Sequence, residues 1–343
     1  MATASTQPTG EPHDVAAHLM DQAMGHLFSA ALRTAAHYRI ADHLAEGPRT
    51  PEQLAVATDT HAPHLRRVLR YLAARGIFRE DAAGAYQLTP TARPLRTDTP
   101  DSLHAAVMMM TDELFLRTSV CLPESVGHGD TSFERLVGAP FYAHLLSDPA
   151  KRDLFDDGTS ALSVPVDEAV VAAYPFPAAG TVVDVGGGRG GLLRTVLRRH
   201  PDLTGVLFDQ APPLARHLLD GDDLKGRWRT EEGDFFSSVP QGGDVYVLKH
   251  VLHDWEDDAC RSILRTCHTA MAKGTRLLVI DCVLPPGNAP HFGKTLDVAM
   301  MAVVHGQERS AEDFSTLLSA GGFRLTRVLP TAAFPSIVEA VAE

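Results

Sequence analysis

Residues 181–191 read TVVDVGGGRGG, and this stretch decides the fold. An apolar run carries one carboxylate, Asp184, and leads into five glycines among six residues. Glycine tolerates positive φ and leaves room for a ligand to approach the backbone. The stretch therefore predicts a buried strand, a tight turn and a helix over 192–199. Such a unit binds nucleotide-like cofactors at the carboxyl edge of a parallel sheet.

Downstream of this turn the pattern alternates between strand and helix. We expect strands over 181–186, 204–209, 227–232, 243–249, 275–281, 323–329 and 336–342, with helices between them, among others over 211–219, 257–272 and 311–320. Such alternation is typical of an α/β fold with helices on both faces of a parallel sheet. The link 330–335 is too short for a crossover helix, so the last two strands should pair antiparallel.

The N-terminal part, residues 15–46, is helical by pattern and ends at Gly47-Pro48. Its apolar residues recur at three-to-four spacing: Leu19, Ala23, Leu27, Ala30 or Ala31, Ala35 and Leu44. Two interpretations stay open for this stripe, which is either core of one chain or the interface of a dimer.

Residues 50–88 predict a winged-helix module. Thr50 should cap a helix that begins at Pro51, with Gln53 closing a capping box. A second helix over 62–75 and two short strands around residues 81–84 complete the module. Arginines on the outer face of the second helix raise a DNA-binding hypothesis. Seven arginines against five acids over 50–100 leave a net charge of only +2, so solvated arginines are the simpler interpretation.

Composition bounds the remaining possibilities. With 343 residues we expect two domains, and 44% hydrophobic and 22% charged residues are ordinary for a soluble protein. The net charge of −12 argues against broad binding to nucleic acid or an anionic membrane. The cysteines show no metal or disulfide spacing: Cys121, Cys260, Cys267 and Cys282. No apolar run reaches ~20 residues, and residues 1–12 form a tail without signal-peptide character. We therefore expect a cytoplasmic protein.

The carboxylates around the turn narrow the choice of cofactor. Gly186, Gly188 and Gly191 satisfy GxGxxG, which would equally suit NAD. Asp209 ends the second strand, where a carboxylate can accept both ribose hydroxyls. Asp184 discriminates, because its charge would repel an NAD pyrophosphate and attract the α-ammonium of S-adenosylmethionine.

Two further stretches end strands at the same edge. Asp234 and Phe235 follow the third strand and offer a carboxylate for an exocyclic amine and an aromatic face for adenine. Lys249 and His253 follow the fourth. His250 and His253 are three residues apart, but no third ligand is evident in the sequence, so we expect no metal.

Five stretches in this order and spacing resemble the small-molecule O-methyltransferase family: VVDVGGGRGG (182–191), FDQ (208–210), GDFF (233–236), LKHVLHDWEDD (248–258) and HGQERSAEDF (305–314). These are class I S-adenosylmethionine enzymes related to plant caffeate and flavonoid methyltransferases and to bacterial enzymes of antibiotic tailoring.

The resemblance implies a Rossmann-like methyltransferase domain with a mostly parallel seven-stranded sheet. It implies a winged-helix dimerisation domain over 1–100, a helical substrate-pocket or linker region over 101–171, and a catalytic domain over 172–343. The middle region is rich in Met and aromatic residues, which suit either plain core or a pocket for a flat apolar ligand.

The resemblance also implies roles for single residues. Those at the cofactor are Gly186 and Gly188 (methionine loop), Asp209 (ribose), Asp234 and Phe235 (adenine) and Lys249. His253 matches the general base, and Asp281 and Glu308 match the acids that hold its imidazole. Asp254 and Met300 match substrate contacts. Plant members usually have Glu where this chain has Asp281, and the segment 297–308 is one residue shorter here, which makes Glu308 the less secure match.

The chemistry agrees with these residue types. A phenol of pKa ~10 must lose its proton as its oxygen attacks the methyl group, and a His of pKa ~6.5 is a suitable base. We expect a homodimeric O-methyltransferase acting on a phenolic or enolic hydroxyl of a small aromatic or polyketide-like metabolite. The alternatives are N- or C-methylation, a cofactor-bound hydroxylase or decarboxylase, a winged-helix regulator that senses S-adenosylmethionine, and an NAD dehydrogenase.

Overall fold

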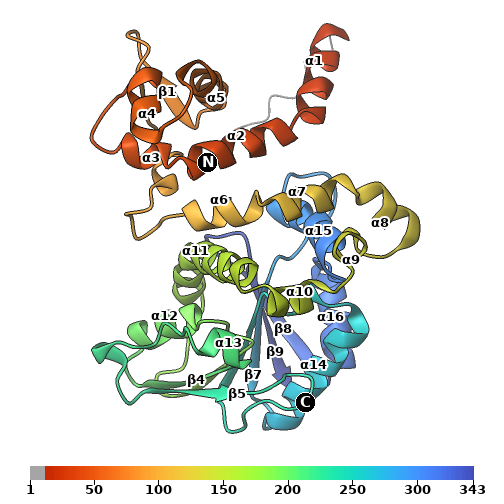
Figure 1. Ribbon diagram of the computed structural model, residues 1–343. Helices are drawn as coiled ribbons and strands as arrows, with labels where there is room; N and C mark the ends of the chain where they lie inside the picture. Colours follow the sequence, from red (N-terminus) through yellow and green to blue (C-terminus); the bar gives the residue numbers. More distant parts are fainter. Residues whose placement is uncertain (1–11) are drawn as a thin grey trace. The chain divides into compact units, whose positions relative to one another are not determined.

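The computed structural model describes residues 12–343 (Figure 1). The chain forms two compact units, one up to Leu116 and one from Arg117 to Glu343. The expected tail lies outside the described residues apart from its last residue. The boundary between the units falls inside the segment 101–171, and the three-part division of the chain stays a prediction.

The first unit is mainly helical. Its elements are α1 (Pro12–Ala23), α2 (His26–His37), α3 (Ile40–His43), α4 (Pro51–Thr58), α5 (Ala62–Ala74), β1 (Phe78–Glu80), β2 (Tyr86–Leu88), η1 (Arg93–Leu95) and α6 (His104–Met110).

The continuous helical stretch expected over 15–46 is broken into three helices. The chain turns after Ala23 and again at Arg39, whose φ of 51° lies in the left-handed region. The apolar stripe is divided as well. Ala35 and its neighbours are buried in the core of the unit, whereas Leu19 is 61% and Leu27 43% exposed in this chain.

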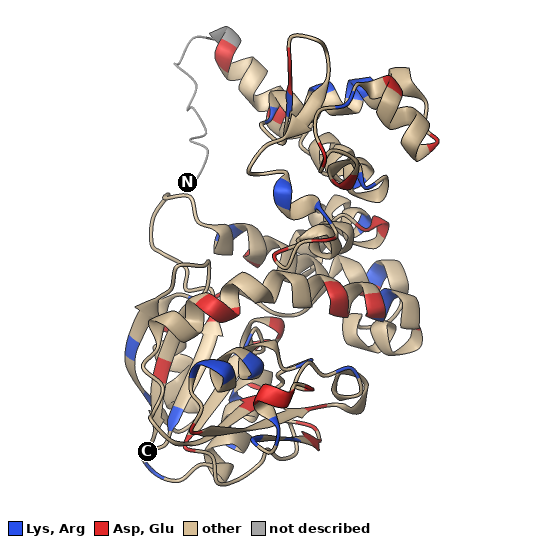
Figure 2. Cartoon of the chain, turned by 90° about the vertical axis from the view of Figure 1, so that its left-hand side faces the viewer, with Lys and Arg blue, Asp and Glu red and all other residues tan. Residues whose placement is uncertain are grey.

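The winged-helix prediction is confirmed. Gln53 N donates to Thr50 Oγ1 and Thr50 N donates to Gln53 Oε1, which completes the capping box. Helix α5 buries Leu65 and Leu69 against the core, and β1 and β2 form an antiparallel hairpin. On the outer face of α5, Arg66 is paired with Glu52. Figure 2 shows that basic and acidic residues are interspersed within each unit.

The second unit contains one seven-stranded sheet in the order β5-β4-β3-β6-β7-β9-β8. Its strands are β3 (Gly180–Val185), β4 (Leu203–Asp209), β5 (Trp228–Glu232), β6 (Val245–Lys249), β7 (Arg276–Asp281), β8 (Phe323–Pro330) and β9 (Ser336–Ala342). The first five in this order are mutually parallel, and β9 pairs antiparallel with β7 and β8. Both features confirm the predictions.

The helices of this part are α7 (Glu113–Val120, across the boundary), α8 (Leu122–His128), α9 (Ser132–Val137), α10 (Phe141–Ser147), α11 (Pro149–Ala173), α12 (Gly191–Arg199), α13 (Ala211–Leu214), η2 (Asp222–Leu224), η3 (Leu252–Asp254), α14 (Asp257–Ala270), α15 (Phe292–Val303) and α16 (Ala311–Ala320). The helix expected over 211–219 was too long and is one turn. Leu218 N instead donates to Arg189 O at 2.8 Å, which ties this segment to the glycine turn.

Alternating side chains of the strands bury both faces of the sheet. Val182 belongs to a core shared with α11 and α12, and Val183 to a core shared with α14 and α16. Figure 1 shows these helix pairs on opposite sides of the sheet. Because β3, β4, β6 and β7 are parallel, their carboxyl ends share one edge, and Asp184, Asp209, Lys249 and Asp281 stand there.

Candidate active site

The glycine turn after β3 requires glycine for two separate reasons. Gly186 and Gly188 have φ values of 66° and 59°, in the left-handed region. Gly187 lies against Asp184, since a Cβ there would be 2.6 Å from the carboxyl carbon of that side chain. The turn therefore brings bare backbone over a buried carboxylate.

Asp184 lies beneath this turn and is 2% exposed. Neither of its carboxylate oxygens has a hydrogen-bond partner among the described residues. Burial raises the pKa of Asp184 to about 7, against the opposing charge of Lys249. A buried carboxylate without partners is costly, and a cation bound beside it would relieve that cost.

Asp209 is bound to the same turn. Its Oδ2 accepts from Gly188 N at 2.7 Å and its Oδ1 from Gln210 N at 2.7 Å. Burial raises the pKa of Asp209, and these two hydrogen bonds oppose the rise. Each oxygen retains a lone pair for a further donor.

The two residues after β5 that are predicted to bind adenine, Asp234 and Phe235, differ from each other in their surroundings. Phe235 lies beside the turn, because a Cβ on Gly186 would be 3.4 Å from Phe235 Cε1. Asp234 is exposed and accepts from Phe236 N at 2.9 Å.

Lys249 is paired with a residue that the sequence analysis missed. Its Nζ is 2.5 Å from Oδ1 of Asp167, which is 2% exposed on α11. Burial raises the pKa of Asp167, and Lys249 opposes the rise. One feature of the sequence could have indicated Asp167: it is an acidic residue within the apolar run around Val166 and Val170.

His253 lies in η3, directly after β6, with 10% of its side chain exposed. Its Nδ1 is 2.8 Å from Oε1 of Glu308, a buried carboxylate, and its Nε2 is 3.4 Å from Oδ1 of Asp254. Burial lowers the pKa of His253, but the carboxylates of Asp254, Glu308 and Asp281 outweigh burial and raise it to about 10. With Nδ1–H donating to Glu308, Nε2 can accept a proton.

Arg309, also missed in the sequence, fixes the loop that carries His253. Its guanidinium is 2% exposed and donates to Leu252 O and to Trp255 O, both at 2.9 Å. The neighbouring Glu308 N donates to Asp297 Oδ1 at 2.8 Å. Two consecutive residues therefore hold the imidazole and the backbone on either side of it.

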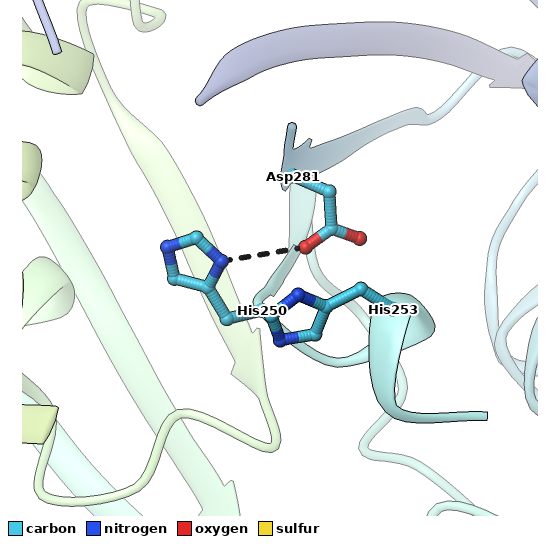
Figure 3. A group of neighbouring side chains, drawn as sticks. All are labelled: His250, His253 and Asp281. Carbon is cyan, nitrogen blue, oxygen red and sulfur yellow. Dashed lines mark ion pairs between the residues drawn. The ribbon is translucent and has the colours of Figure 1, made fainter. Parts of the chain in front are cut away.

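Asp281 ends β7 and is completely buried, with no hydrogen bond to either carboxylate oxygen among the described residues. Nδ1 of His250 lies 3.5 Å from Asp281 Oδ1 (Figure 3), and burial lowers the pKa of His250, so its ring is neutral. His250, His253 and Asp281 offer three ligand atoms within 4.8 Å of one another. Asp281 is thus the third potential ligand that was not evident in the sequence, and the absence of a metal stays a prediction.

The predicted substrate residues lie in two places. Asp254 accepts a hydrogen bond from the hydroxyl of Tyr142, whose ring stacks on Trp255 at 6.1 Å and 16°. Tyr142, on α10, was not singled out in the sequence. Met300 is half-buried on α15, in the segment that leads to Glu308. Its contact with a substrate stays a prediction.

Comparison with known proteins decides the family. Residues 121–324 match the family model of the O-methyltransferase domain, and residues 20–98 match that of the O-methyltransferase dimerisation domain. The chain belongs to the O-methyltransferase family. Its α/β fold and its N-terminal helical domain are those predicted from the motifs.

Relatives of this O-methyltransferase match along nearly their whole length. Phenazine O-methyltransferase PhzM of Lysobacter antibioticus is 40% identical over 325 residues, which cover 94% of this chain and 95% of the relative. The crystal structure of CalO1, a methyltransferase in calicheamicin biosynthesis in its SAH-bound form, has a TM-score of 0.90 at 43% identity. The match covers 97% of this chain and 99% of CalO1.

The family also includes a relative with a different reaction in its name. Aclacinomycin 10-hydroxylase RdmB of Streptomyces purpurascens is 33% identical over 346 residues, which cover 95% of this chain and 89% of RdmB. Family membership alone therefore does not fix the reaction.

Among the described helices, none has both the length and the apolar character to cross a membrane.

Proposed function

We propose that the protein transfers the methyl group of S-adenosylmethionine to a phenolic or enolic hydroxyl of a small aromatic metabolite, with His253 as the general base. The observation that carries this proposal is the 2.8 Å contact between His253 Nδ1 and the buried Glu308. It favours Nε2 for the proton-accepting role, which methyl transfer to oxygen requires and hydroxylation does not.

The residues around the turn fit the cofactor. The partnerless oxygens of Asp184 favour a bound cation such as an α-ammonium, and the free lone pairs of Asp209 suit ribose hydroxyls. Phe235 offers an aromatic face beside the turn. When bound, S-adenosylmethionine supplies an electrophilic methyl group on a positively charged sulfur.

His253 takes the proton of the acceptor hydroxyl at Nε2. The negative charges of Glu308 and Asp281 stabilise the imidazolium that forms, and Glu308 holds the tautomer. The raised pKa of His253 means that the imidazole by itself is largely protonated at neutral pH. A cation bound beside it lowers that pKa, because like charges disfavour the protonated form.

The acceptor class is inferred from aromatic residues and from the relatives. Tyr142, Phe236 and Trp255 form a cluster of rings next to Asp254. PhzM is named for a phenazine, a flat fused aromatic ring system. A flat hydroxylated acceptor that packs against these rings fits both observations.

We infer that the protein forms a homodimer. Residues 20–98 match a dimerisation domain, and large apolar side chains on and between α1 and α2 are exposed in the single chain. They are Val15, Leu19, Met20, Met24 and Leu27, each at least 43% exposed. Burial of such a patch against a second copy would stabilise a dimer.

The reaction is tested by mass spectrometry. The enzyme is incubated with S-adenosylmethionine and a panel of a hydroxyphenazine, a naphthol and a catechol. We expect a product heavier by one CH₂ group together with S-adenosylhomocysteine, and neither with His253→Gln. A product heavier by one oxygen atom would instead place the protein with RdmB in reaction type.

A further inference from the structure

Three buried charged residues lie together on one face of the sheet, next to the glycine turn: Asp184, Lys249 and Asp167. Side chains two residues apart on a strand point to the same face, so Asp184 shares the face of Val182, and Lys249 that of Val247. Both valines belong to the core that α11 and α12 cover (Figure 1). Asp184 on β3 is paired with Val247 on β6, which makes Lys249 its diagonal neighbour. Asp167 reaches the same place from α11.

The ammonium of Lys249 lies between two carboxylates and is bound to one of them. Its Nζ is 2.5 Å from Asp167 Oδ1, and the two side chains are 12% and 3% exposed. Both oxygens of Asp184, in contrast, have no hydrogen-bond partner among the described residues. The charge of Lys249 nevertheless acts on Asp184, because it opposes the rise of the Asp184 pKa. Lysine has a long flexible side chain, and diagonal neighbours on adjacent strands are within its reach. Lys249 can therefore pair with either carboxylate.

The position of Asp167 is set by helix packing and not by the lysine. Val166 and Val170, on the same stretch of α11, are buried in the core shared with α12. Oδ2 of Asp167 lies against the first residue of α12, since a Cβ on Gly191 would be 2.8 Å from it. The positive end of the dipole of α12 favours a carboxylate at this place. Asp167 is thus a fixed partner, whereas the side chain of Lys249 can rotate.

Pairing of Lys249 with Asp184 would interfere with the cofactor. In the proposed function, the partnerless oxygens of Asp184 receive the α-ammonium of S-adenosylmethionine. An ammonium from the chain itself would satisfy the same oxygens before the cofactor arrives, and it would repel the incoming positive charge. A device that keeps Lys249 away from Asp184 therefore strengthens cofactor binding.

We propose that Asp167 is this device: it is a positioning residue that holds the ammonium of Lys249 and so leaves Asp184 free for the α-ammonium of the cofactor. Asp167 acts through Lys249 and does not itself contact the cofactor. No covalent bond changes and no proton moves. The proposal rests on the proposed function, because it matters only if the site binds a ligand with an α-ammonium group.

Three variants isolate the charge of Asp167. Asp167→Asn keeps the shape of the side chain and removes the charge, so that Lys249 is attracted to Asp184. Glu168→Gln is the matched control, because it removes the same charge from the next residue of α11, whose side chain is exposed. The double variant Asp167→Asn with Lys249→Met also removes the competing ammonium. Circular dichroism and thermal melting identify any variant that fails to fold.

The readout is the Kd of two matched ligands, measured by calorimetry. S-adenosylhomocysteine carries the α-ammonium, and 5′-methylthioadenosine is an adenosyl thioether that lacks the whole amino-acid part. We expect Asp167→Asn to raise the Kd for S-adenosylhomocysteine about tenfold or more, because the cofactor loses a charged hydrogen bond to Asp184. The Kd for 5′-methylthioadenosine should stay near its wild-type value, and Glu168→Gln should change neither. The double variant should bind S-adenosylhomocysteine more tightly than Asp167→Asn alone.

Other results would overturn the proposal in distinguishable ways. Equal weakening of both ligands by Asp167→Asn would mean that Asp167 only supports the fold of the site. Weaker binding of S-adenosylhomocysteine that the double variant does not relieve would make Asp167 a direct ligand of the ammonium.

Two further outcomes complete the test. If Asp167→Asn alone does not fold, the double variant is compared with Lys249→Met, and a higher Kd for S-adenosylhomocysteine in the double variant would refute the role, because no competing ammonium remains. Wild type that binds neither ligand would refute the proposed function and this role with it. Wild-type affinity of Asp167→Asn for S-adenosylhomocysteine would refute this role alone.

Discussion

Nδ1 of His253 and Oε1 of Glu308 lie 2.8 Å apart, and the carboxylate of Glu308 is fully buried. The contact joins the end of β6 to a segment 55 residues later. It leaves Nε2 as the proton-accepting nitrogen of a buried imidazole. A buried and oriented imidazole of this kind suits the general base that we propose, because a carboxylate holds one nitrogen and the other nitrogen can accept a proton.

Removal of the imidazole tests the base directly. We expect His253→Gln to lower kcat by at least ~10²-fold while the Kd for S-adenosylmethionine stays near the wild-type value. His305→Gln is the matched control, because His305 is half exposed and pairs with Glu134. Steady-state kinetics and calorimetry measure the two quantities. Loss of cofactor binding in the His253 variant would contradict the assignment.

The clamp formed by Arg309 should matter for both stability and turnover. Arg309→Met removes the charged hydrogen bonds to Leu252 O and Trp255 O, each worth about 1.5–3 kcal/mol, and the ion pair with Asp257. We expect a lower free energy of unfolding in urea and a larger loss in kcat than in KM. Arg261→Met is the control, since Arg261 makes exposed ion pairs on α14 and should change little. Equal effects of the two variants would refute the clamp.

We expect the buried carboxylate of Asp184 to lower the free energy of unfolding and to strengthen cofactor binding. Its pKa is raised from 3.8 to about 7, so the folded state binds more protons than the unfolded state between these values. The contribution of Asp184 to the free energy of unfolding is therefore fully present below pH 4 and is lost as the pH rises to 7. Asp184→Asn has no such loss, so the stability advantage of the variant should grow over this pH range in urea titrations. We expect the same variant to bind S-adenosylmethionine more weakly. A stability difference independent of pH would contradict the buried, partnerless carboxylate.

The exposed apolar side chains of the first unit predict self-association. We expect wild type to sediment as a dimer and Leu19→Glu to shift it toward monomer at micromolar concentration, because a charge would be buried in the interface. Val56→Glu is the control, since Val56 is 87% exposed on α4, away from the patch in sequence. Analytical ultracentrifugation distinguishes the states. A wild-type monomer would contradict the dimer.

The sequence predicts the elements that depend on local signals. The glycine turn, the capping box of Thr50 and the alternation of strands depend on neighbouring residues, and the structure has all three. The helix expected over 211–219 was too long, because the contact of Leu218 with the distant Arg189 prevails over local propensity. The break at Arg39 likewise carries no glycine or proline signal.

The site was harder to predict where partners are distant. Spacing along one strand end indicates His253, but the pairing of Lys249 with Asp167 joins residues 82 apart on different elements. The contacts of Arg309 and of Tyr142 with the loop around His253 are of the same kind. For Asp281, the resemblance supplied a role at His253. The 3.5 Å contact of Asp281 with His250 could not be predicted, because it depends on the left-handed backbone conformation of His250.

The most direct test of the central claim is a thermal-shift titration with S-adenosylmethionine, S-adenosylhomocysteine and NAD, on wild type and on Asp209→Ala. A ligand at 100 times its Kd stabilises the folded state by ~2.7 kcal/mol, a readable rise in Tm. We predict a rise with the two adenosyl-sulfur ligands in wild type and its loss in the variant, because Asp209 lies at the glycine turn. A rise with NAD alone, or no rise with either adenosyl-sulfur ligand, would contradict the account.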